Sequence, residues 1–151
     1  MIITYNTYKF PGKFEKFVTI FTDINNNAEY RVDITGFVKA IPMGVLEVKP
    51  RKISLGGGFK TGSVIPVSFE IANTGDFDME VTRIVLKKKK TILFDAAHSG
   101  VIIIKPGKKE KIETTITSDT SGRMLDYAMI HSDARNVTKK GYKVVVVATF
   151  E

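Results

Sequence analysis

The chain has 151 residues, of which 43% are hydrophobic, a formal net charge of +7 at pH 7 and no cysteine. This length suits one domain or slightly more, and this amount of apolar material excludes global disorder. The lack of cysteine excludes disulfides, thiolate nucleophiles and cysteine metal sites, but it leaves the compartment open, so export as part of a longer chain is compatible with the sequence.

Residues 1–38 have the pattern of three β-strands. Met1–Phe10 (MIITYNTYKF) is rich in strand formers and lacks the basic-then-apolar order of a signal peptide. Two more β-rich runs follow, separated from it by a turn at Gly12 and from each other by "TDINN" at Thr22–Asn26. A short link, "KAIPMG" at Lys39–Gly44, then holds this part close to the rest of the chain because it contains a proline.

Residues 45–151 contain many short strand-like runs separated by turn residues. In "KIETTIT", Ile112, Thr114 and Ile116 fall on one face of a strand, as a half-buried strand requires. No run reaches the roughly 20 apolar residues of a membrane helix. Seven or more such runs predict an all-β fold, an antiparallel immunoglobulin-like β-sandwich.

The segment "NTGD" at Asn73–Asp76 predicts a tight turn between the second and third strands of this sandwich, strands B and C. We expect Gly75 to adopt a positive φ there. We also expect Asn73 or Asp76 to bond the local backbone.

The start of the chain resembles its end. Ile3–Val38 and Thr115–Phe150 both run from a strand through a glycine turn to a second strand, an Asp/Asn turn and a tyrosine-initiated third strand. The matching positions are Gly12 with Gly122, Asp23 with Asp133, and Tyr30 with Tyr142. Such self-similarity predicts repeated domains: residues 1–38 are the last three strands (E, F and G) of a partial copy, 39–44 a linker, and 45–151 a complete copy.

The stretch "LEVKPRKISLGG…TGSVIPVSFEIANTGDFDMEVTRIVL" resembles the bacterial domain-of-unknown-function family numbered 1573, an immunoglobulin-like group akin to ASH and Hydin domains. The residues that carry the resemblance are Pro50, Ile53, Leu55, Gly56, Asn73, Thr74, Gly75, Ser132, Asp133 and Asn136, with Thr22, Asp23 and Asn25 in the partial copy. The resemblance implies a docking or structural module. Many family members have a Cys-Gly-Cys segment where this chain has "KKKKTILFDA", so a redox or metal role based on those cysteines is unavailable here.

The sequence lacks the residue combinations that catalytic and cofactor-binding motifs require. The loop "GGFKTGS" at Gly57–Ser63 lacks the lysine and the helix with which a phosphate loop binds its ligand. His98 and His131 lack the three or four convergent ligands of a zinc site. Ser132 and His131 are adjacent on a strand and point to opposite faces, so they cannot share a proton. We therefore predict no enzyme, no cofactor and no metal.

The positive charge is concentrated between Leu86 and Lys111, a stretch with eight lysines and only two acidic residues, Asp95 and Glu110. The D–E turn (Lys105–Lys109) and the F–G loop (Asp133–Gly141) should share one end of the sandwich. Together they form a candidate partner-binding basic pole of Lys105, Lys108, Lys109, Arg135, Lys139 and Lys140. A second basic run, Lys87, Lys88, Lys89 and Lys90, should lie at the opposite end. The alternative interpretation of both is a solvated surface.

The partial copy motivates the functional hypothesis. Three strands do not close a sandwich, so Ile20, Val32, Ile34 and Phe37 form a candidate strand-pairing surface. The missing strands could belong to a longer tandem protein or to a second chain, or the three strands could extend the complete domain. We expect a non-enzymatic structural or assembly module whose partners are other protein chains or neighbouring immunoglobulin-like domains, self-assembly included. The alternative is a basic module that binds nucleic acid or another acidic polymer.

Overall fold

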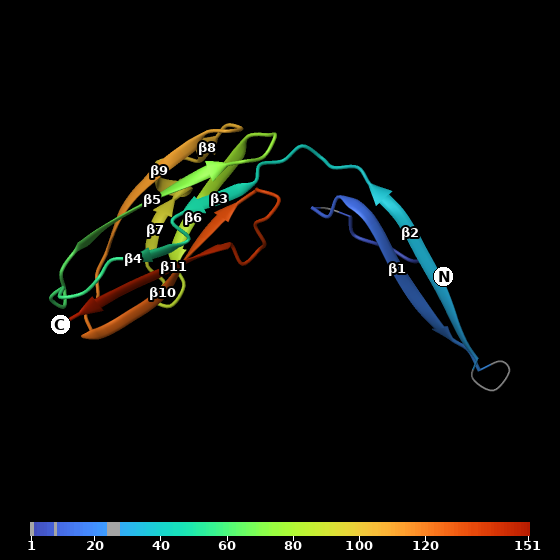
Figure 1. Cartoon of the computed structure of the whole chain (residues 1–151), viewed down its shortest axis with the longest axis horizontal. Coiled ribbons are helices and arrows are strands. Elements are labelled where there is room, and N and C mark those ends of the chain that lie inside the picture. The colour runs from blue at the N-terminus through green and yellow to red at the C-terminus, as the bar shows by residue number, and fades with distance from the viewer. Residues whose placement is uncertain (1, 8, 24–27) are drawn as a thin grey trace. The chain divides into compact units, whose positions relative to one another are not determined.

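The computed structural model describes residues 2–7, 9–23 and 28–151, and the chain divides into two compact units, Met1–Ile41 and Pro42–Glu151 (Figure 1). Each unit is described by itself. Strands dominate both, as expected from the many β-branched and aromatic residues. A four-residue helix, α1 (Ala96–Ser99), is capped by the side chain of Asp95, which accepts a hydrogen bond from the Ala97 N–H at 3.0 Å.

The first unit contains an antiparallel hairpin of β1 (Gly12–Phe21) and β2 (Glu29–Val38). Its register places Gly12 opposite Val38 and Phe21 opposite Glu29. Asn25, one of the residues that carry the family resemblance, lies outside the described residues.

The third strand expected in residues 1–38 is not present in the described part, because residues 2–7 lie in no strand. The chain turns before β1, where the Phe10 N–H donates to the Thr7 carbonyl at 3.0 Å and Lys9 has a φ of 65°. The side chain of Tyr5 nevertheless contacts the hairpin, with its ring 4.7 Å from that of Phe14. The second unit explains the difference. Its E strand, β9 (Lys109–Ile116), pairs with its B strand, β5 (Ile65–Asn73), and the described part of the first unit offers no such partner.

The second unit is a sandwich of two sheets, as the sequence predicts. One sheet has the order β3–β5–β9, formed by β3 (Leu46–Lys49), β5 (Ile65–Asn73) and β9 (Lys109–Ile116). The other has the order β4–β11–β10–β6–β7, with β8 also paired to β6. Its strands are β4 (Lys52–Ser54), β6 (Met79–Leu86), β7 (Ile92–Asp95), β8 (Ile102–Ile104), β10 (Gly122–Ser132) and β11 (Tyr142–Phe150).

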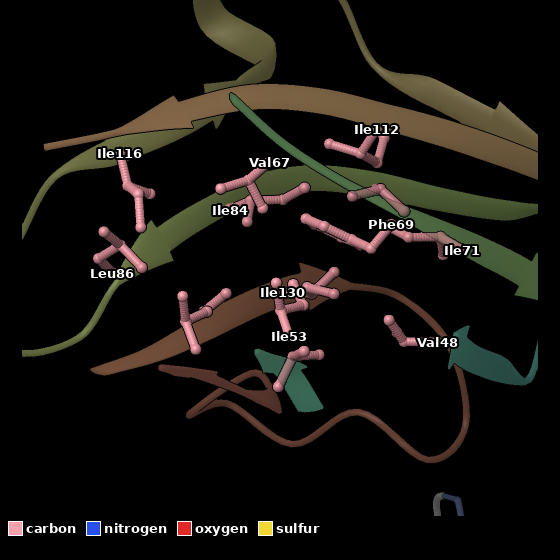
Figure 2. Packing of buried hydrophobic residues seen from close by; sticks show 14 of the residues in the cluster. Val48, Ile53, Val67, Phe69, Ile71, Ile84, Leu86, Ile112, Ile116 and Ile130 are labelled. Carbon is pink, nitrogen blue, oxygen red and sulfur yellow. The ribbon is translucent and has the colours of Figure 1, made fainter. Parts of the chain in front are cut away.

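The core lies between these two sheets. Alternate residues of β5, such as Val67, Phe69 and Ile71, are buried, and they belong to one cluster with Ile84 and Ile130 of the other sheet (Figure 2). This alternation is what an antiparallel sheet with one covered face requires. The core residues all come from the second unit, between Leu46 and Phe150.

The hairpins β1–β2 and β10–β11 share a backbone plan. Gly12 begins β1 with a φ of 110° and lies opposite Val38, the last residue of β2. Gly122 begins β10 with a φ of 98° and lies opposite Phe150, the last residue of β11. Residues counted from these ends are called matching positions below.

Candidate functional site

One face of the β1–β2 hairpin is apolar and includes three of the four residues expected to pair with other protein. Val18 lies opposite Val32, so their side chains share a face, which alternation extends to Ile20 and Ile34. We call this surface the hairpin face: Phe14, Val18, Ile20, Tyr30, Val32, Ile34 and Val38. It also holds one cation, Lys16, which lies opposite Ile34. Phe37 lies on the other face of the hairpin and is 70% exposed.

Sequence reasoning missed Phe14, Val18, Tyr30 and Val38. The signal was present, because each lies an even number of residues from a named residue of the same strand: Val18 and Phe14 from Ile20, Tyr30 from Val32, and Val38 from Ile34. Phe14 also depends on a glycine across the ladder: a Cβ at Gly36 would lie 2.7 Å from two atoms of the Phe14 ring. The ring therefore covers the glycine, an arrangement known to support exposed strands.

The hairpin face matches the inner face of β10–β11 position by position. The pairs are Phe14 with Met124, Val18 with Ala128, Ile20 with Ile130, Tyr30 with Tyr142, Val32 with Val144, Ile34 with Val146, Gly36 with Ala148 and Val38 with Phe150. In β10–β11 most of these side chains are buried by the opposite sheet. In β1–β2 none is buried, and Tyr30 and Val32 are 52% and 40% exposed. The hairpin thus presents a core-type face with no covering layer in the described part of its unit.

The predicted basic pole has its two loops at one end of the sandwich. The D–E turn contacts strand B, because the Gly107 N–H donates to the Asn73 carbonyl at 2.8 Å. The F–G loop lies at the same end, where the side chain of Asn136 bonds both backbone groups of Leu46 at 2.8 and 2.9 Å. Leu46 is opposite Asn73 in the ladder, and this brings the loops together.

The charge of this pole is partly neutralised. Lys109 forms an ion pair with Glu70, with Nζ–O distances of 2.9 and 3.0 Å. Carboxylates also lie at this end, since Asp133 accepts from the Glu80 N–H and Asp76 from the Met43 N–H, each at 2.9 Å. Lys105, Lys108, Lys139 and Lys140 are exposed, and Arg135 is half-buried. A partner-binding role of the six residues stays a prediction.

The run Lys87–Lys90 forms the turn after β6, at the opposite end of the sandwich from the start of that strand. Its conformation depends on the buried carboxylate of Asp126, which accepts from the N–H groups of Lys88 at 2.9 Å and Lys89 at 3.1 Å. Lys90 completes the turn with a φ of 58°. The backbone of this turn therefore has a structural basis that does not depend on the lysine side chains, and a partner-binding role of these four side chains stays a prediction.

The B–C turn differs from the expectation at Gly75. Asn73 bonds the local backbone as expected, accepting from the Gly75 N–H at 2.9 Å. Gly75, however, is not among the glycines with positive φ. A glycine is needed for space: a Cβ would lie 2.3 Å from the carbonyl oxygen of Met43 and 2.6 Å from the nitrogen of Val45. The chain entering β3 lies directly on this turn, a contact that local sequence does not reveal.

Among the described residues, no group of three or more His, Cys, Asp or Glu side chains could hold a metal ion. His98 lies in α1, and His131 lies on β10 opposite Arg83. No helix among the described residues is long and apolar enough to span a membrane.

The fold resembles those of solved proteins. A protein of unknown function from Porphyromonas gingivalis W83 matches over 93% of this chain with a TM-score of 0.54 and 13% identity. This chain covers 66% of that structure, slightly less than two thirds of its length. The ASH/PapD-like domain 7 of human CEP192 matches over 76% of this chain and 90% of its own, with a TM-score of 0.53 and 10% identity. No family model and no curated protein matches the chain.

These likenesses show that the chain has the fold of an immunoglobulin-like β-sandwich. The Porphyromonas alignment must include part of Met1–Ile41, because Pro42–Glu151 makes up less than three quarters of the chain. The CEP192 domain aligns with 76% of the chain, a length close to that of the second unit, Pro42–Glu151, by itself.

Proposed function

We propose that this protein is a non-enzymatic assembly module, and that its hairpin face makes the protein–protein contact. The observation that carries the proposal is the match between the hairpin face and the inner face of β10–β11. Equivalent side chains are core residues in one hairpin and open to water in the other. A two-stranded hairpin is marginally stable alone, so the hairpin gains its order from another layer.

The layer that fits is a three-stranded sheet of the same kind as β3–β5–β9, which covers the matching face in the second unit. It must also place a carboxylate against Lys16, the charged residue of the hairpin face, because an unpaired ammonium is costly to bury. It would come from another chain or from a neighbouring immunoglobulin-like domain. The Tyr5 ring lies against Phe14 at one end of the hairpin face, so the covering layer would contact the rest of the face, from Val18 to Ile20 and from Tyr30 to Ile34. The alignment with the longer Porphyromonas structure is compatible with a tandem arrangement.

Membership of the family numbered 1573 is part of the same proposal. Ile53 is in the core and Leu55 packs against it, while Gly56 has a φ of 84°. Asn73 is fully buried and its amide makes four hydrogen bonds. These four residues thus have structural roles, as expected of a module without catalytic chemistry.

The test is amide hydrogen exchange of the full chain over a range of concentrations, together with sedimentation. We expect the amides of β1 and β2 to exchange rapidly in the monomer and to become protected as the chain associates. Val32→Glu places a charge on the hairpin face and should abolish both association and protection. Phe37→Glu, on the opposite face of the same strand and opposite Lys13, should change neither.

Two results would contradict the proposal. One is protection of the hairpin amides in a monomer, since the chain itself would then cover the face. The other is a chain that stays monomeric at high concentration with both variants behaving alike.

The alternative of a basic module for nucleic acid has less support, because Lys109 of the basic pole is paired with Glu70 and the carboxylates of Asp76 and Asp133 lie at the same end of the sandwich.

A further inference from the structure

The outer face of the β4–β11–β10–β6–β7 sheet is unexpectedly apolar. Leu125 lies opposite Val147, and Tyr127 opposite Val145, all four with side chains directed away from the core. Met129, their neighbour on β10, is 9% exposed although it lies outside the core cluster. We call this surface the outer apolar face: Val85, Ile92, Leu125, Tyr127, Met129, Val145 and Val147.

The other outer face of the same sandwich is polar and largely self-neutralised. On the β3–β5–β9 sheet, ion pairs join Lys109 to Glu70 at 2.9 Å and Lys49 to Glu47 at 3.5 Å, and Lys111 to Glu113. The Lys111 ammonium, which hydrogen-bonds Glu113, holds the pKa of that carboxyl below its ordinary value. This is the usual surface of an antiparallel sheet that faces water.

The β1–β2 hairpin shows that apolar residues are not needed at these positions. Its matching positions are polar: Glu15 for Leu125, Thr19 for Met129, Asp33 for Val145 and Thr35 for Val147. The cation–aromatic contact between the strands is kept, with Arg31 4.3 Å from the Phe17 ring and Lys143 5.2 Å from the Tyr127 ring. The same backbone plan therefore accepts either kind of surface, and the apolar one has a cause beyond folding.

Unneutralised cations surround the outer apolar face. The ammonium groups of Lys143 and Lys88 lie 5.2 and 5.7 Å from the centre of the Tyr127 ring, and Lys52 lies opposite Val145 on β4. None of these three lysines forms an ion pair with a carboxylate in the described part of the chain. Arg83 at the border pairs with Asp95 at 3.7 Å.

We propose that the outer apolar face docks an acidic protein segment whose apolar stripe is flanked by carboxylates. An apolar centre with aromatic and methionine side chains is typical of interface cores, and the lysines supply the complementary charge. A second copy of this chain is disfavoured, since stacking two such faces would bring four ammonium groups around two tyrosines. Nucleic acid is disfavoured because the surface has one aromatic ring among aliphatic side chains and no series of stacking platforms.

The experiment uses the isotope-labelled full chain and two designed amphipathic helical peptides of about 18 residues, or five turns. One has a leucine stripe flanked by glutamates, and the other has lysines in place of the glutamates. We expect the glutamate peptide to shift the NMR signals of Leu125, Val145 and Val147, and its affinity to fall with salt. The lysine peptide should not bind.

The matched variant takes its residues from the first hairpin. Val145→Asp with Val147→Thr reproduces the matching polar positions, which this backbone accepts, and should weaken binding of the glutamate peptide by about tenfold or more. Ser68→Asp adds the same charge to the outer face of the other sheet and should leave binding unchanged. A thermal melt of each variant verifies folding.

Three outcomes would overturn the proposal. The first is glutamate-peptide binding that the double variant does not weaken. The second is equal binding of the lysine peptide, which would indicate apolar contact without charge recognition. The third is a larger shift of the same signals by a random single-stranded DNA, which would assign the face to nucleic acid. The proposal does not involve the hairpin face, so the two experiments succeed or fail separately.

Discussion

Asn73 organises one end of the sandwich through a single buried side chain. Its Oδ1 accepts from the Val45 N–H at 3.1 Å and its Nδ2 donates to the carbonyl of Ile104 at 2.8 Å. The same amide bonds Gly75 and Phe77, so one residue joins the B–C turn to the start of β3 and to the D–E turn. The sequence predicted a local bond for Asn73. The hydrogen bonds to Val45 and Ile104 could not be predicted, because these partners are backbone groups about 30 positions away. Every residue has such groups, so the sequence does not indicate which of them will lie near Asn73.

The glycine of this turn supplies the first residue-scale prediction. Because a Cβ at Gly75 would overlap Met43 and Val45, Gly75→Asn should lower the free energy of unfolding by about 2 kcal/mol or more. Gly107→Asn should be nearly neutral, since Gly107 has open space and a φ of 71°, which asparagine tolerates. Urea denaturation of both variants measures the difference. Equal costs at the two positions would show that the close approach of Met43 and Val45 does not require a glycine at position 75.

The strands of the second unit were largely predictable, since each has a period of two bounded by turn residues. The first unit was less so. A strand was expected before β1. A strand forms only where a neighbouring strand supplies backbone hydrogen bonds, and amino-acid composition does not reveal whether such a strand is present. The position of Phe37, in contrast, could have been predicted. It lies three residues after Ile34 on the same strand, and an odd separation places two side chains on opposite faces. The outer apolar face was missed because a continuous apolar run such as that of β11 is also typical of a strand covered on both faces, so the sequence does not show that one of its faces is open.

The turn between β6 and β7 yields a prediction for an element. Asp126→Ala removes the acceptor for Lys88, Lys89 and the Tyr127 N–H at 2.7 Å, and should lower the free energy of unfolding by about 2–4 kcal/mol. Denaturation by urea measures the loss, with the exposed Asp119→Ala as the control that changes charge equally. A stable Asp126→Ala variant would mean that the lysine turn holds its conformation without its buried acceptor.

At the scale of the molecule, the hydrophobic cluster indicates which part folds by itself. All of its members lie between Leu46 and Phe150. Deleting residues 1–39 should therefore leave the cooperative unfolding of the sandwich in place, with its free energy changed by less than about 0.5 kcal/mol. Calorimetry of the full and shortened chains tests this. A shortened chain that melts broadly or much earlier would show that residues 1–39 contribute to the stability of the second unit.

The match between the two hairpins also matters while the chain is being made. β1 and β2 leave the ribosome before β5 and β9, whereas β10 and β11 leave last. The nascent sheet of β5 and β9 thus meets an early hairpin with nearly the same apolar pattern as its proper partner. The position that distinguishes the two is Lys16, which matches Asp126. An ammonium there would be buried without a carboxylate and close to the turn of Lys88 and Lys89, so the early hairpin is a poor competitor and the sandwich stays open for β10.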